Sequence, residues 1–190
     1  MMKLTQVSTT FDEPVTLPQL RQHLTLETNE FDSYLTRLIS TSRELAEQYI
    51  NGIIADRQFR VTLDCFTSTI ELPINPIDTS SISISYVDTS GNTQSQATFA
   101  TDGDFFKTTI KPAYNENWPS TEPGYDKVTI TFTAGCLGNL GYMPDGVKHA
   151  VLMIAGTAFD QRENHTTHVK LHTVPMSSEL LLNSYKRVVL

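Results

Sequence analysis

The hydrophobic periodicity of the chain changes twice along its 190 residues, and this constrains the fold more than any single motif. Apolar residues recur every three or four positions before about residue 57, alternate with polar residues over 58–134, and return to helical spacing after about residue 142. An amphipathic helix has a period near 3.6 residues and a half-buried strand a period of two. The sequence therefore predicts helices at both ends of the chain and strands between them.

Two helices are expected before the strands. The first begins in the run Thr16–Gln19, whose Thr and Gln have capping-box spacing and whose Pro suits a first turn. The second begins near Glu30, with Asn29 as the expected N-cap and Asp32 favoured by the helix dipole. It ends at Asn51-Gly52, a pair that adopts left-handed geometry readily.

The rest of the chain completes an α+β pattern. Strand alternation occurs at 59–63, 82–86 and 128–132, and a broad apolar stripe from Val147 to Phe159 predicts a third long helix. A short last helix is expected from Ser177 or Ser178. The predicted organisation is a flexible N-terminal arm (1–13), a helical scaffold (14–57 and 142–185), an inserted small antiparallel β module (58–134) and a C-terminal tail (186–190).

Composition excludes several classes of protein. Hydrophobic residues make up 39% and charged residues 18%, which is too apolar for a disordered chain. The net charge of −7 argues against a protein that grips phosphate backbones through bulk charge. Cys65 and Cys136 are too few for a disulfide scaffold or a structural zinc site. No apolar run approaches the roughly 20 residues of a membrane span, and no signal-peptide pattern is present, so we expect an intracellularly made, soluble protein.

Catalytic and metal-binding motifs are weak. His165, His168 and His172 would share one helix face, but their β-branched neighbours favour an exposed polar loop, so no metal ligand is assigned. There is no nucleophile elbow, P-loop or dinucleotide fingerprint, so no catalytic or cofactor-binding residue is assigned. The acidic pair Glu44 and Glu47 is expected to be solvated.

One proline-flanked loop, residues 111–119, combines Tyr114 with Trp118, the only tryptophan. Such a loop is either pinned to its own β module or forms an interface hot spot. Both interpretations stay open at this level.

Short segments, mostly structural in character, follow one another in a specific order along the chain: Pro14–Leu20, Leu38–Glu44, Ile70–Pro73, Tyr86–Asp88, Ile110–Tyr114, Trp118-Pro119, Val128–Gly135, Pro144–Lys148, Asp160–Asn164, Val174–Met176, Leu180-Leu181 and Tyr185–Arg187. In this order they resemble the head–tail connector (adaptor) proteins of long-tailed bacteriophages. The resemblance covers nearly the whole chain. Cys136 stands where that family usually has an aromatic residue, and Phe159-Asp160 replaces a Tyr-Glu-like pair; both differences concern packing.

The resemblance implies a non-enzymatic, structural role in the virion, at the head–tail junction, after assembly in the host cytoplasm. Such connectors form a ring, commonly of twelve copies, below the portal protein. The ring extends the DNA channel and offers a platform for the next neck or tail-completion protein. DNA passes without sequence-specific binding, and neither cofactor nor membrane is implied.

Two sets of residues are candidates for contacts in such an assembly. Ala155, Gly156 and Phe159, together with Tyr114 and Trp118, are candidates for the subunit interface, because a ring needs two different complementary patches. The tail, Lys186, Arg187, Val188, Val189 and Leu190, combines positive charge with a β-prone end and is a candidate for portal interaction, or is a frayed terminus.

Two alternatives remain. A tail-completion or terminator protein would also form a ring. A small cytoplasmic hydrolase or metal-binding enzyme would use His165, His168 or Cys136.

Overall fold

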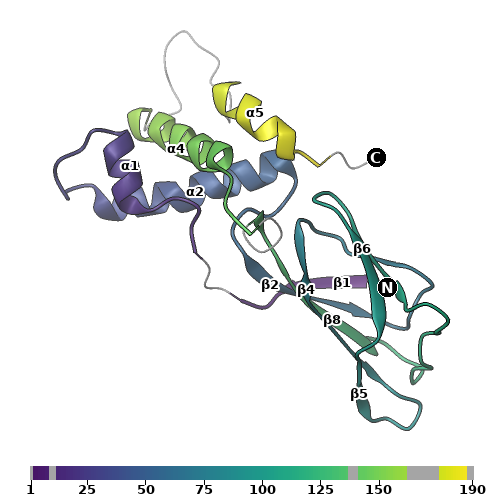
Figure 1. The fold of residues 1–190 in the computed structure, drawn as a ribbon. Helices are drawn as coiled ribbons and strands as arrows, with labels where there is room; N and C mark the ends of the chain where they lie inside the picture. Colours follow the sequence, from purple (N-terminus) through teal and green to yellow (C-terminus); the bar gives the residue numbers. More distant parts are fainter. Residues whose placement is uncertain (1, 9–11, 137–140, 162–175, 188–190) are drawn as a thin grey trace. The chain divides into compact units, whose positions relative to one another are not determined.

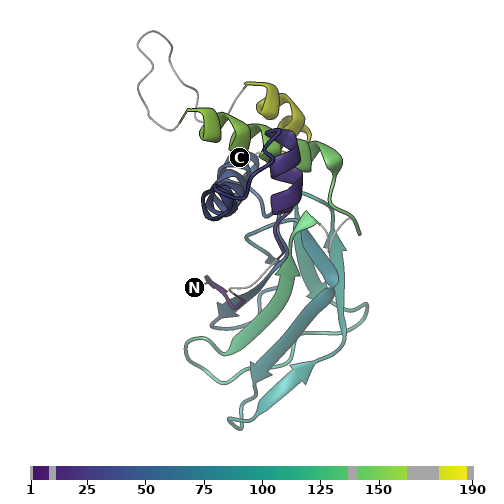
Figure 2. The ribbon, with the colours of Figure 1, turned by 90° about the vertical axis from the view of Figure 1, so that its left-hand side faces the viewer.

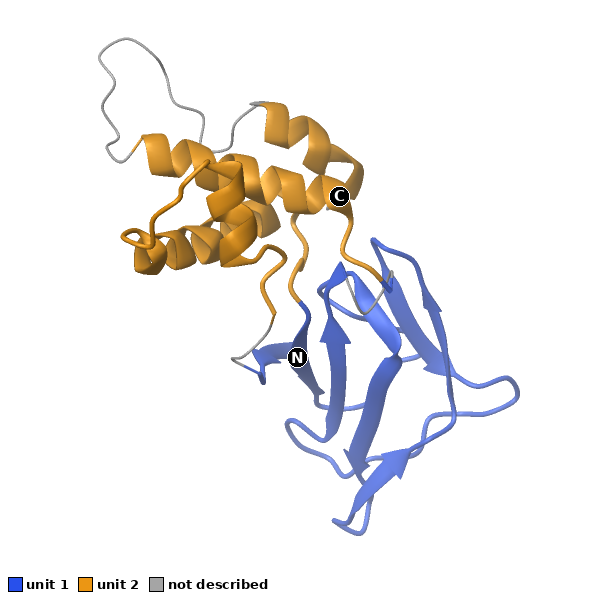
Figure 3. Ribbon diagram, turned by 60° about the vertical axis from the view of Figure 1, so that its left-hand side comes forward, with its two compact units in different colours: residues 1–11, 56–141 blue, residues 12–55, 142–190 orange. Residues whose placement is uncertain are grey.

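The computed structural model of the chain describes residues 2–8, 12–136, 141–161 and 176–187. The chain divides into two compact units, residues 1–11 with 56–141 and residues 12–55 with 142–190 (Figure 3). The first unit consists of strands in two antiparallel sheets, and the second consists of helices. The α+β class predicted from the periodicity is confirmed.

The helical unit packs one long helix against several shorter ones. Its elements are α1 (Leu17–His23), α2 (Asp32–Ile50), α4 (Asp145–Asp160), α5 (Met176–Leu182) and the 3₁₀ turn η1 (Asn183–Tyr185). α4 lies beside both α2 and α5 (Figures 1 and 2). The core between α1, α2 and α4 is made of apolar side chains: Leu20, Leu35, Leu38, Ile39 and Ala155. No helix among the described residues is long and apolar enough to span a bilayer.

Capping residues set the start of α1 and the end of α2. The N–H of Thr16 donates to Oε1 of Gln19 at 2.8 Å, which is one half of the predicted capping box. Asn51 ends α2 with a φ of 53°, as expected of a left-handed C-cap. The start of α2 differs from the prediction. A turn closed by the Asp32 N–H on the Asn29 carbonyl (3.2 Å) precedes the helix, so Phe31 and not Asn29 occupies the N-cap.

The β unit contains a five-stranded and a three-stranded sheet. Its strands are β1 (Met2–Gln6), β2 (Arg57–Leu63), β3 (Ile70–Glu71), β4 (Ile77–Val87), β5 (Thr93–Gln96), β6 (Phe99–Gly103), β7 (Thr108–Pro112) and β8 (Val128–Ala134). The strand order is β1-β2-β8-β4-β5 in the larger sheet and β3-β7-β6 in the smaller, with every neighbouring pair antiparallel.

The five-stranded sheet has one apolar and one hydroxyl-rich face. One row of paired residues runs Leu4, Val61, Ile130, Ile84 and Gln96 across the five strands, and its three central members are buried. The next row, on the opposite face, runs Lys3, Thr62, Thr129, Ser85 and Ser95. Because side chains alternate between faces along a strand, the β-branched, Thr- and Ser-rich sequence of this region yields a two-faced sheet.

The N-terminal segment differs from the expected flexible arm. Residues Met2–Gln6 form β1 and pair with β2, with Met2 opposite Leu63 and Gln6 opposite Phe59. The Val7 N–H continues this ladder by donating to the Gln58 carbonyl at 2.8 Å. Backbone pairing with an existing strand orders a short polar segment that would not hold a structure alone.

Candidate assembly surfaces

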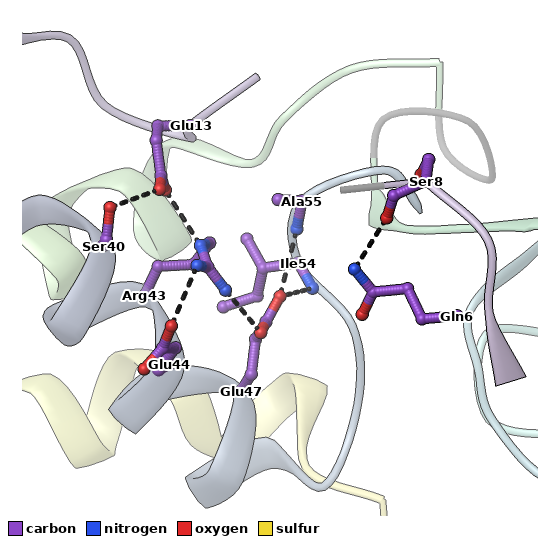
Figure 4. Close-up of polar contacts among 9 residues, drawn as sticks. All are labelled: Gln6, Ser8, Glu13, Ser40, Arg43, Glu44, Glu47, Ile54 and Ala55. Atoms are coloured by element: carbon purple, nitrogen blue, oxygen red, sulfur yellow. Dashed lines mark hydrogen bonds and ion pairs between the residues drawn. The ribbon is translucent and has the colours of Figure 1, made fainter. Parts of the chain in front are cut away.

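A buried ion-pair cluster fixes two segments of the helical unit to α2 (Figure 4). The side chain of Arg43 is only 2% exposed; its Nε lies 2.9 Å from Oε2 of Glu13 and its Nη1 lies 2.8 Å from Oε2 of Glu47. Oε1 of Glu47 accepts the backbone N–H groups of Ile54 (2.9 Å) and Ala55 (3.3 Å). The cluster is structural, since a buried charge is stable only when it is paired and hydrogen-bonded.

The sequence analysis predicted that Glu44 and Glu47 are both solvated, and this is right for Glu44 only. Glu44 lies at the surface, 3.4 Å from Arg43, but Glu47 is buried and not solvated. A signal was available, because Ile39, Arg43, Glu47 and Ile50 follow the spacing of the apolar stripe of α2. Two opposite charges four residues apart on a buried face indicate an internal ion pair.

The small residues of α4 are covered within the chain itself. Ala155 is 1% exposed and belongs to the helical core. A Cβ added to Gly156 would lie 3.4 Å from the imidazole of His23, so this glycine lets α1 approach α4 closely. The ring of Phe159 packs edge-on to that of Phe31, with centroids 5.6 Å apart. Ala155 and Gly156, predicted as interface candidates, therefore present no exposed surface to a second subunit, because α1 of the same chain occupies their face.

The aromatic loop separates into a packed and an exposed part. Trp118 stacks on Phe66 with ring centroids 4.6 Å apart and planes 6° apart, and Phe66 also contacts Tyr86 edge-on. Trp118 therefore holds its own loop against the β unit. Tyr114 is 92% exposed, and Tyr125, in the same connection between β7 and β8, is also largely exposed. Of the two aromatic candidates, Tyr114 is the one that is free to contact another molecule.

The start of the C-terminal tail is attached to α2. The Arg187 N–H donates to the Ile50 carbonyl at 2.7 Å, and Nζ of Lys186 lies 4.4 Å from the centroid of the Tyr49 ring. The Tyr49 hydroxyl donates to Oδ1 of Asn183 at 2.7 Å. The chain thus leaves the helical unit beside the C-terminal end of α2. Val188, Val189 and Leu190 lie outside the described residues.

Most of the chemical candidates fall outside the part of the chain that the structure describes. His165, His168 and His172 lie outside the described residues, and among the residues that the structure does describe no three His, Cys, Asp or Glu side chains are placed to hold a metal. Cys136 is buried, whereas Cys65 is exposed. Two other histidines do meet: the rings of His23 and His149 are 6.1 Å apart beside a hollow of about 510 Å³ between α1 and α4.

The acidic balance is shared by both units. The β unit carries six Lys and Arg against ten Asp and Glu, and the helical unit eight against eleven. Neither unit is therefore a basic module of the kind that binds nucleic acid through its phosphates.

The strands at the two edges of the larger sheet are exposed. Every described side chain of β1 is exposed, including those of Met2 and Leu4. Nζ of Lys3 lies 2.6 Å from Oδ2 of Asp126, and Oδ1 of Asp126 accepts the Thr62 hydroxyl at 2.9 Å. The hydrogen bond from Lys3, with smaller help from Thr62, holds the pKa of Asp126 below its usual value, and the same carboxylate raises the pKa of Lys3. This contact ties β1 to the loop before β8.

The fold of the chain is similar, over almost its whole length, to that of chains in solved structures. A chain in a structure of the neck of an empty gene transfer agent particle, computed with C6 symmetry, superimposes with a TM-score of 0.77 at 21% identity, covering 99% of this chain and 97% of that one. The chain shares its fold with a neck chain. A chain in the virion of a native gene transfer agent particle gives 0.75 at 20% identity, covering 98% and 96%. A chain in the neck of the native particle, computed with C12 symmetry, gives 0.67 at 22% identity, covering 99% and 97%.

No protein-family model matches the sequence, and no curated protein sequence matches it either. The likeness to the gene transfer agent chains therefore rests on the fold.

Proposed function

We propose that this protein is a structural, non-enzymatic connector of the neck of a phage-like particle, and that it forms a ring between the portal and the tail. The observation that carries the proposal is the end-to-end likeness of its fold to chains from gene transfer agent necks, at 97% coverage of the other chain. Both units contribute to a match of this extent. The collinear sequence resemblance to phage head–tail adaptors supports the same role independently.

A ring is the assembly that the proposal requires. Two of the similar neck structures were computed with C6 and C12 symmetry, so copies are arranged around an axis in those particles. A cyclic ring needs two different, complementary patches on each subunit. The exposed β1 and the exposed loop around Tyr114 lie on the β unit and are available for such contacts. Twelve copies are our working number.

Portal binding is assigned to the C-terminal tail. Residues 186 and 187 begin beside the end of α2, and the sequence that follows, Val188–Leu190, is apolar and β-prone. Such a segment suits addition to a strand or insertion in a groove of the portal. The platform below the ring would receive the next neck or tail-completion protein.

The charge distribution suits a channel that DNA crosses without being held. Both units are net acidic. The hydroxyl-rich face of the larger sheet, opposite its apolar face, carries side chains such as those of Thr62, Thr129 and Ser85. A wall of this kind offers few cations to phosphates, so counterion release would contribute little to binding.

Reconstitution with separate partners tests the proposal. The purified full-length chain is mixed with portal rings or with tail tubes of the same particle, and the products are viewed by electron microscopy. We expect a ring of density below the portal and none on tail tubes. Rings that cap tail tubes and ignore the portal would instead favour a terminator role. Failure to bind either would overturn the proposed function.

A further inference from the structure

Among the described residues, β1 and β5 each have a neighbouring strand on one side only, so the larger sheet ends in two open edges. The two edges lie at opposite ends of the same five-stranded order and belong to strands of similar length, Met2–Gln6 and Thr93–Gln96. An unpaired edge presents a row of N–H and C=O groups that can template another strand. The alternation of inward- and outward-facing backbone groups along each edge strand shows which N–H and C=O groups are unpaired.

On β1 the outward groups belong to Met2, Leu4 and Gln6. The Val7 N–H donates to Gln58, its partner in the continued ladder, so the backbone of Val7 faces β2. In an antiparallel pair, residues alternate between facing the partner strand and facing away. The backbones of Lys3 and Thr5 therefore face β2 as well, and those of the alternate residues point outward.

On β5 the outward groups belong to Thr93 and Ser95. The Asp88 N–H donates to the Asn92 carbonyl at 2.9 Å, so this pair faces inward. By the same alternation, Gln94 and Gln96 bond to β4, and the residues between them point away from it. Each edge thus offers a short row of groups with no backbone partner on the described chain.

Neither edge carries the usual protection against pairing. Natural edge strands are commonly guarded by charged residues, prolines or bulges. β5, with the sequence TQSQ, has none of these, and the one charge of β1, Lys3, is held by Asp126. Leu4 is 42% exposed, although it lies on the same face as Val61, which is fully buried. The apolar face of the sheet therefore continues onto β1 without a cover from the described residues.

We propose that β1 of one subunit pairs with β5 of the neighbouring subunit, so that the five-stranded sheets join edge to edge around the ring. The occupant of the open β1 edge is thus a second copy of this chain. The inference rests on the proposed ring and specifies its subunit contact.

The topology favours β5 of the neighbouring subunit, and not its β1, as the partner of β1. Five strands in alternating directions make β1 and β5 run the same way. In a ring of many copies, the rotation that carries one subunit onto the next is small, so the paired edge strands keep nearly the same direction and the joint between them is parallel. Two different edges also meet the requirement of a ring for a heterologous contact, whereas pairing of β1 with β1 is isologous, antiparallel and closes at a dimer.

Cross-linking in the assembled ring tests the pairing. Leu4 and Gln94 lie on the same face of the sheet, so L4C and Q94C are combined in a C65S background, because Cys65 is exposed. Rings bound to portal are treated with a flexible bis-maleimide and analysed under denaturing conditions. We expect a ladder of covalent oligomers beyond the dimer from the double variant and monomers from each single variant. Dimers from L4C alone would overturn the inference in favour of β1–β1 pairing.

A backbone substitution provides the second arm. The Ser95 N–H points away from β4, so S95P removes an outward donor and leaves the β4–β5 ladder intact, while S95A keeps the donor. We expect S95P to weaken ring formation by about tenfold or more, as the loss of an interface hydrogen bond of ~1.5 kcal/mol implies, and S95A to assemble normally. Normal rings from S95P, or rings without the cross-linked ladder, overturn this contact and leave the connector function standing. Absence of any ring from the unsubstituted chain on portal overturns both the contact and the connector function.

Discussion

Arg43 and Glu47 lie one turn apart on α2, and their side chains form a buried ion pair with 2.8 Å between Nη1 and Oε2. Through it, α2 holds the two segments at which the chain enters and leaves this part of the helical unit. Glu13 binds the other side of the guanidinium, and Glu47 caps the N–H groups of Ile54 and Ala55. The connections of the helical unit are therefore fixed by charge as well as by apolar packing.

Replacing Glu47 tests this role. E47A leaves the Arg43 guanidinium without its closest buried carboxylate and removes the acceptor of two buried N–H groups, so we expect a loss of about 3–5 kcal/mol in the free energy of unfolding. The measurement is thermal unfolding followed by circular dichroism at 222 nm, which reports the helices. E44A is the matched control, because Glu44 is largely exposed, and it is expected to change stability by less than about 0.5 kcal/mol. Equal effects of the two variants would contradict the assignment.

The attachment of β1 depends on pH. The pKa of Asp126 is lowered, so its contribution is present above the ordinary carboxyl pKa and is lost as the pH falls through the lowered value. The pKa of Lys3 is raised, so its contribution is present below the ordinary lysine pKa and is lost as the pH rises through the raised value. We expect the protection factors of the β1 amides, which are measured by hydrogen exchange and corrected for the intrinsic pH dependence of amide exchange, to be lower at either extreme than at neutral pH.

D126N is the matched variant for this contact. Asp126 has a φ of 55°, a conformation that Asn also tolerates, so the backbone is preserved while the charge is removed. The variant should show faster hydrogen exchange in Met2–Gln6 at neutral pH, and its β1 should respond less to acid than that of the natural chain. Unchanged protection of β1 would show that backbone pairing with β2 alone holds the strand.

Gly135 is required where β8 ends. Its φ is +156°, and an added Cβ would lie 2.5 Å from the Cα of Asp56. Because the obstructing atom belongs to the backbone, G135A must shift the start of β2 or the end of β8, and we expect a loss of several kcal/mol in the β unit, of the order seen for forced core strain. Trp118, the only tryptophan, lies in this unit, so its fluorescence reports the unfolding. G146A, at a glycine with no atom within 4 Å of an added Cβ, serves as the control.

If the C-terminal tail binds the portal, shortening it should weaken portal binding without lowering the stability of the helical unit. Deleting residues 188–190 leaves the Arg187 bond to Ile50 in place, so the helical unit should unfold at the same temperature as in the full chain. Binding to the portal should fall by at least about tenfold if the apolar end adds to a portal strand. Normal portal binding by the shortened chain would remove the tail from the proposed interface.

Local patterns were sufficient to predict α1, α2, α4, α5 and the central strands β2, β4 and β8, but not the other strands. The capping-box spacing of Thr16 and Gln19, the left-handed Asn51 and the alternation around Val61 and Ile130 each depend on neighbours in the sequence, and each is confirmed. Long-range pairing was not predictable in this way. β1 is ordered by β2, more than 50 residues away, and the short alternation of Met2 and Leu4 with polar residues does not identify that partner.

The same distinction applies to the surfaces. The sequence left open whether the aromatic loop packs on its own β module or forms an interface, and the stack on Phe66 shows that Trp118 packs inward while Tyr114 stays exposed. The small residues of α4 indicated a close helix contact, and the structure shows that α1 of the same chain makes it. Small side chains indicate close approach without identifying which surface approaches.

The proposed function requires that the protein form a ring below the portal. The most direct test is the mass of the complex that the full-length chain forms with isolated portal rings, measured by native mass spectrometry. We expect one dominant species in which a fixed number of copies, twelve if the ring matches a twelve-fold portal, has joined the portal. Portal rings that keep their own mass in an excess of the chain would contradict it.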